Sequence, residues 1–79
     1  MPATVYARLK HLIIEQLGVE EEDIADSSSF TDDFNADSLE LADLVSSIEE
    51  EFGLEIPGED ARRLLTVQEV VDYIEEHVA

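Results

Sequence analysis

Few residues in this chain could carry out chemistry, and their types argue against catalysis. Cysteine is absent, and histidine occurs twice, at His11 and His77. The chain therefore has no thiol nucleophile, disulfide or thiolate metal site, and a serine hydrolase would need a histidine that reaches its serine. Both histidines fall near the ends of predicted helices, where a solvated side chain is the ordinary expectation. An enzyme is thus disfavoured.

An acidic segment matches part of a calcium-binding loop but lacks its decisive ligands. Asp33, Asn35 and Asp37 occupy positions 1, 3 and 5 of an EF-hand loop. Position 6 would then be Ser38 in place of glycine, and position 12 would be Leu44 in place of the bidentate glutamate. We therefore expect no dedicated metal site, only weak screening of the acidic surface by divalent ions.

One hydroxyl remains of interest, that of Ser38. Asp37 is a good N-cap candidate with Glu40 three residues later, which together form a capping box. Ser38 would then lie in the first turn of a helix, with its hydroxyl not needed for capping. Unpaired N–H groups at that end favour an attached or incoming anion such as a phosphate. An ordinary first-turn serine would give the same pattern, so helix signals alone leave both interpretations open.

The elements that must position Ser38 are helices. Apolar residues repeat with a 3.6-residue period in three segments, which predicts amphipathic helices over residues 5–17, 38–52 and 67–78. Gly18 and Gly53 stand where the first two should end, and Thr66 is the N-cap candidate of the last. A short helix is expected over residues 58–65, with Ala61, Leu64 and Leu65 as its apolar contacts.

The segment between the first two long helices has no sustained period. Residues 19–36 are rich in Glu, Asp and Ser, and we expect a short helical turn there, held to the core by Val19, Ile24, Phe30 and Phe34. No β alternation occurs in the sequence. The predicted fold is all-α: a small four-helix bundle, three main amphipathic helices plus one short helix, with a long loop after the first. It should form a single domain over residues 1–79.

Charge narrows the choice of partners. The 79 residues include 21 acidic and 4 basic side chains, a net charge of −17, and no Lys or Arg lies between His11 and Ala61. Binding to nucleic acid is argued against because phosphate contacts need Lys and Arg, and anionic membranes should repel the chain. A basic protein partner fits this surface. Without a signal peptide pattern or a long apolar run, we expect a cytoplasmic monomer.

The stretch from Asp33 to Leu41 resembles the prosthetic-group attachment motif of acyl carrier proteins, whose core Asp-Ser-Leu stands here as Asp37-Ser38-Leu39. The resemblance extends through residues 15–19, 29–30, 49–57, 66–68 and 72–74, in that family's order and spacing. Asn35 stands where members often have glycine, and Asn also suits a left-handed turn. Ala42 and Ser46 are smaller than the apolar residues typical of fatty-acid carriers at these positions, which keeps a specialised pathway open.

The resemblance implies that a phosphopantetheinyl transferase attaches a 4′-phosphopantetheine arm to Ser38. The thiol of the arm would hold acyl groups as thioesters, so a chain without cysteine can serve thioester chemistry. The protein would be a substrate and shuttle for fatty-acid or type II polyketide-like biosynthesis. An aminoacyl carrier of a specialised pathway and an unmodified acidic helix-docking adaptor remain alternatives.

The resemblance also implies two further sets of residues. The docking set would be read by basic surfaces of partner enzymes and comprises Asp37, Leu39, Glu40, Asp43, Glu49 and Glu50. The acyl-pocket set would shelter the acyl chain between the helices and comprises Leu41, Leu44, Val45, Ile48, Phe52, Leu64 and Val67.

Overall fold

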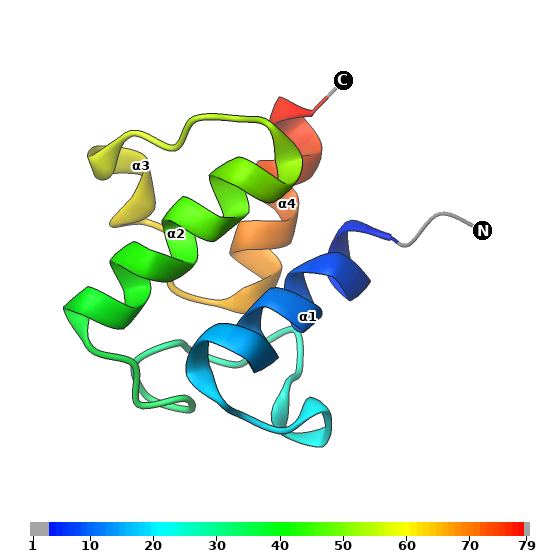
Figure 1. Ribbon diagram of the computed structural model, residues 1–79, viewed down its shortest axis with the longest axis vertical. Helices are drawn as coiled ribbons and strands as arrows, with labels where there is room; N and C mark the ends of the chain where they lie inside the picture. The colour runs from blue at the N-terminus through cyan, green and yellow to red at the C-terminus, as the bar shows by residue number, and fades with distance from the viewer. Residues whose placement is uncertain (1–3, 79) are drawn as a thin grey trace.

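The helices follow the predicted order. A computed structural model describes residues 4–78, and within that range it contains four α-helices and one 3₁₀ turn. They are α1 (Val5–Leu17), η1 (Glu21–Asp23), α2 (Ser38–Phe52), α3 (Gly58–Ala61) and α4 (Val67–His77). No strand occurs in the described part of the chain, where a lone antiparallel bridge joins Ser29 and Thr66. The all-α prediction is confirmed (Figure 1).

Local signals set the ends of the long helices. The side chains of Thr4, Asp37 and Thr66 cap the N-termini of α1, α2 and α4, and the last two complete the predicted capping boxes. Gly18 and Gly53 end α1 and α2 with φ of 69° and 65°. A side chain in this left-handed region costs roughly 1–2 kcal/mol, which is why glycine stands at both positions.

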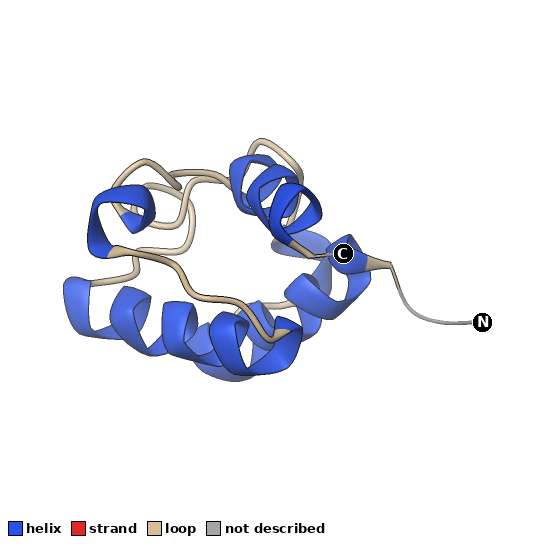
Figure 2. Cartoon of the chain, turned by 90° about the horizontal axis from the view of Figure 1, so that it is seen from above, coloured by secondary structure: helices blue, strands red, loops and turns tan. Residues whose placement is uncertain are grey.

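The three long helices enclose one apolar core. Helix α1 packs against both α2 and α4, and Figure 2 shows α2 along one side of the molecule with α3 and α4 along the other. Five large side chains of the core are essentially inaccessible to solvent, and they come from α1, α2 and α4: Leu9, Ile13, Leu44, Val67 and Ile74. Each belongs to a helical stripe that the 3.6-residue period predicts.

The long loop is pinned to the core as expected. Its helical turn is η1, and Ile24, Phe30 and Phe34 are buried, while Val19 is half-buried against the same core. The rings of Phe30 and Phe34 meet edge to face with centroids 5.9 Å apart. Apolar anchors therefore give the loop a defined course although it has no periodic structure of its own.

The short third helix ends earlier than predicted. It covers Gly58–Ala61 and not residues 58–65, and it tightens into i→i+3 turns at Arg63 and Leu64. The cause lies in the loop: the carbonyl of Leu65 accepts the N–H of Phe30 at 3.2 Å, and the carbonyl of Ser28 accepts the N–H of Val67 at 3.1 Å. This pairing draws the chain out of the helix.

The pairing also corrects the role predicted for Leu65. It leaves the Leu65 side chain 59% exposed, so Leu65 is not the apolar contact we expected.

Candidate functional site

The loop before α2 delivers Ser38 to the first position of that helix. Asn35 adopts the left-handed conformation, with φ of 56°, which suits its short polar side chain. Ala36 is buried, and its N–H donates to the carbonyl of Phe30 at 2.9 Å. Asp37 is extended, with φ of −90° and ψ of 178°, and is the N-cap residue. The course of the loop thus depends on Phe30, which is itself a core residue.

The capping box leaves the hydroxyl of Ser38 available. The N–H of Glu40 donates to Asp37 Oδ1 at 2.8 Å, and the N–H of Asp37 donates to Glu40 Oε1 at 3.1 Å. Ser38 is exposed, and its hydroxyl makes no hydrogen bond with another residue between positions 4 and 78. An exposed hydroxyl at a helix N-terminus can accept a phosphate ester there without loss of an internal contact.

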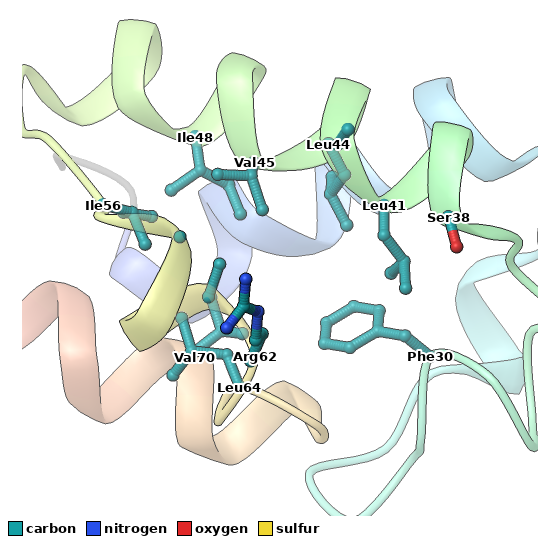
Figure 3. A pocket seen from close by; sticks show the side chains of 13 residues that line it. Phe30, Ser38, Leu41, Leu44, Val45, Ile48, Ile56, Arg62, Leu64 and Val70 are labelled. Atoms are coloured by element: carbon teal, nitrogen blue, oxygen red, sulfur yellow. The ribbon is translucent and has the colours of Figure 1, made fainter.

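A cavity of about 410 Å³ begins at Ser38 and extends between α2 on one side and α3 and α4 on the other (Figure 3). This volume lies in the range of pockets that hold small ligands, about 300–1,000 Å³. Most of its walls are apolar side chains, and it is lined by Phe30, Ser38, Leu41, Ala42, Leu44, Val45, Ile48, Ile56, Gly58, Ala61, Arg62, Leu64 and Val70. The cavity therefore offers an apolar space next to an accessible hydroxyl.

The structure brings most of the acyl-pocket set to this cavity. Leu41, Leu44, Val45, Ile48 and Leu64 line it. The other two members of the set lie elsewhere. The ring of Phe52 lies 4.4 Å from the guanidinium carbon of Arg8, near the end of α2. Val67 is wholly buried in the core.

Phe30, Ile56, Arg62 and Val70 are among the lining residues that lie outside the predicted acyl-pocket set. The sequence predicts Phe30 to be a loop anchor and Val70 to be a core residue of the last helix. Ile56 belongs to no periodic pattern. Arg62 stands out in the sequence only as part of a basic pair. No local pattern could show that these side chains meet α2 across one space.

The docking set lies on α2 and at its N-cap, and its members differ in their exposure and in the hydrogen bonds that they form with the rest of the chain. Leu39 is 70% exposed, and Asp43 and Glu50 are exposed on the same stripe of the helix, four and eleven residues further on. Asp37 and Glu40 form the capping box. Glu49 is half-buried, and its Oε2 accepts the N–H of Ile56 at 2.7 Å. Within the docking set, Asp43 and Glu50 are therefore the carboxylates whose charge can change without loss of a hydrogen bond to another residue between positions 4 and 78.

A tyrosine holds the short helix that forms part of the cavity wall. The hydroxyl of Tyr73 in α4 donates to Asp60 Oδ2 in α3 at 2.8 Å. Burial raises the pKa of the Tyr73 phenol to about 12, and the hydrogen bond to Asp60 and the negative charge of that carboxylate add to the effect. The phenol stays neutral and donates throughout the physiological range.

Among residues 4–78, His, Asp and Glu side chains do not gather into a group of three that could hold a metal ion. None of the helices within these residues has the length and apolar composition needed to cross a bilayer.

Comparisons with known proteins agree with the geometry. Residues 7–74 match the family model described as phosphopantetheine attachment site. The chain is also similar to the solution structure of a protein from Anaplasma phagocytophilum that is described as a putative acyl carrier protein. The two superpose with a TM-score of 0.86 at 32% sequence identity, over 99% of this chain and 98% of that one.

Proposed function

The chain belongs to the phosphopantetheine attachment site family, and on that premise we propose that Ser38 is the residue that carries the 4′-phosphopantetheine arm. Members of this carrier family are modified and used by other enzymes and are not catalysts themselves. The observation that carries the proposal is the exposed Ser38 hydroxyl within Asp37-Ser38-Leu39, at the edge of an apolar cavity.

The proposed attachment forms one bond at Ser38. Its Oγ would give up a proton and become esterified to phosphorus, while the transferase releases the 3′,5′-ADP part of coenzyme A. The bound arm supplies a terminal thiol that holds acyl groups as thioesters. The capping box keeps Asp37 and Glu40 hydrogen-bonded to each other, so the serine hydroxyl has no competing partner among the described residues of the helix end.

The cavity supports a second part of the proposal, that this chain shelters the acyl group it carries. Apolar side chains of α2, among them Leu41, Leu44 and Ile48, face Leu64 and Val70 across the space. Burial of an acyl chain there gains about 0.8 kcal/mol for each methylene removed from water. Helix α3 is four residues long, so little structure has to move to admit the chain.

The docking set supports the third part, recognition by basic surfaces of the transferase and of acyl-transferring enzymes. The chain carries a net charge of −17, and such a field raises the rate of encounter with a basic partner. Ala42 and Ser46, both small and exposed on α2, offer little apolar contact. We propose that the carrier serves fatty-acid or type II polyketide-like biosynthesis, and the small side chains at these two positions keep a specialised pathway open.

The attachment is tested by intact mass after incubation with coenzyme A and a phosphopantetheinyl transferase. We expect one added phosphopantetheine on the wild-type protein, none on Ser38→Ala, and one on the control Ser46→Ala, which alters an exposed serine of the same helix. Modification of Ser38→Ala, or its loss in Ser46→Ala, would show that another serine carries the arm. An unmodified wild-type protein would favour the adaptor alternative.

Docking is tested by charge reversal at Asp43 and Glu50, since neither change disturbs a hydrogen bond within the described residues. Asp43→Lys and Glu50→Lys should each lower the rate of association with the transferase, and added salt should lower it for the wild type. Glu75→Lys on α4 is the matched control, because it makes the same change in net charge away from α2. Equal effects of all three variants would mean that net charge, and not the face of α2, governs binding.

A further inference from the structure

Within the part of the chain that the structure describes, Arg62 is the one charged residue that lines the cavity. It directly follows α3, and Figure 3 shows its guanidinium group between the side chains of α2 on one side and Leu64 and Val70 on the other. An apolar acyl chain needs no cation in such a place. Arg62 is exposed to solvent, as arginines usually are, but its position beside the cavity puts a cation next to any group that enters there.

The basic residues of this chain differ in their pairing. Arg8 forms an ion pair with Glu51 at 2.8 Å, and Lys10 forms one with Glu21 at 3.3 Å. Among residues 4–78, neither Arg62 nor Arg63 forms an ion pair or a side-chain hydrogen bond, although the chain has 21 acidic residues, and of the two only Arg62 lines the cavity. The nearby carboxylate of Asp60 is engaged by the hydroxyl of Tyr73. The five N–H donors of the Arg62 guanidinium thus remain available to a group that enters the cavity.

We propose that Arg62 makes this carrier selective for acyl groups that bear a carboxylate at their far end. The inference rests on the proposed attachment of the arm to Ser38. The methylene part of such a group would lie against Leu41 and Leu44, and the carboxylate would meet the planar fork of the guanidinium, which it matches with two hydrogen bonds. A simple aliphatic acyl group of equal length gains no such pairing.

The phosphate of the arm is the other anion that could reach this cavity. It is bonded directly to Ser38, and in Figure 3 Leu41 and Phe30 lie between Ser38 and Arg62. The position of Arg62 beyond these apolar side chains favours the acyl end over the phosphodiester. The experiment below distinguishes the two.

The test compares two six-carbon acyl groups on the full-length protein, adipoyl with a terminal carboxylate and hexanoyl without one. A transferase loads each from its coenzyme A thioester onto wild type, Arg62→Gln and the control Arg63→Gln, and intact mass verifies the loading. Arg63→Gln makes the same change at the next residue, which does not line the cavity. Hydroxylamine then cleaves the thioester, and the cleavage rate reports how well the acyl group is sheltered.

We expect adipoyl to be cleaved about threefold faster from Arg62→Gln than from wild type, because a partly exposed ion pair makes a contribution of about that size. Hexanoyl should be cleaved at equal rates from both, and Arg63→Gln should match the wild type. The Nε–H resonance of Arg62 should shift when adipoyl is loaded and stay in place when the arm alone is attached.

Other results overturn the inference. If Arg62→Gln raised the cleavage rates of adipoyl and hexanoyl equally, the role of Arg62 would be merely structural. If it changed neither cleavage rate, the proposed selectivity would be refuted. A shift of the Arg62 resonance on attachment of the bare arm would identify the phosphate as its ligand. In each of these cases the arm has still been attached to wild-type protein, so the proposed attachment to Ser38 would stand. Failure to add any arm to wild-type protein would refute the assignment of Ser38, and this inference with it.

Discussion

Removal of one hydroxyl in Tyr73→Phe should loosen the short helix beside the cavity. The Tyr73 hydroxyl donates to Asp60 Oδ2 at 2.8 Å and connects α4 to α3. Helix α3 has four residues and no side-chain cap at its N-terminus, so few other contacts hold it. We expect the variant to fold, with greater mobility confined to α3 and its flanks.

The size of the stability loss in Tyr73→Phe follows from the environment of the Tyr73–Asp60 hydrogen bond. Hydrogen bonds to charged groups contribute about 1.5–3 kcal/mol, and because both residues are only half-buried, water replaces part of the loss. We therefore expect unfolding to become easier by about 1 kcal/mol, which corresponds to a fall of about 4–8 °C in the thermal midpoint for a domain of this size.

The pKa of Tyr73 adds a dependence on pH with a definite sign. Its value rises from 10.0 to about 12 in the folded protein, so folding favours the protonated phenol. The contribution to stability is complete below pH 10 and is lost as the pH rises from about 10 towards about 12. The difference in stability between wild type and Tyr73→Phe should shrink over this interval.

Urea denaturation from pH 7 to 12 measures both effects, and amide hydrogen exchange locates the loosened segment. Tyr6→Phe is the matched control, because the Tyr6 hydroxyl has no hydrogen-bond partner among residues 4–78. It should change stability by no more than about 0.5 kcal/mol. Equal stability of Tyr73→Phe and wild type at pH 7, or faster exchange spread evenly over all the helices, would refute this account of α3.

Two further predictions concern capping and charge. Asp37→Ala removes the acceptor at the start of α2 and should cost about 1 kcal/mol of unfolding free energy in urea, with faster amide exchange in the first turn of α2; unchanged stability would mean that water replaces the cap. The net charge of −17 disfavours the compact state, so the thermal midpoint at neutral pH should rise with sodium chloride and rise further with millimolar magnesium. A midpoint that stays level or falls as salt is added would contradict this argument.

The sequence by itself determined the long helices and the place of Ser38. Helical period and caps are local properties, because the residues that form them lie within four positions of one another. The two capping boxes at Asp37 and Thr66 therefore stand where the pattern predicts them, and so do the helix ends at Gly18 and Gly53. The order of motifs along the chain likewise predicted the family, which the comparisons confirm.

Only the tertiary structure decided which segments share the cavity and where α3 ends. The hydrogen bonds of residues 28–30 with residues 65–67 shorten α3 and expose Leu65, and they join positions more than thirty residues apart. The same arrangement brings Phe30 and Arg62 to the cavity wall and leaves Phe52 and Val67 outside it. No periodic pattern encodes such meetings, because they depend on how three helices and a loop fill one small core together.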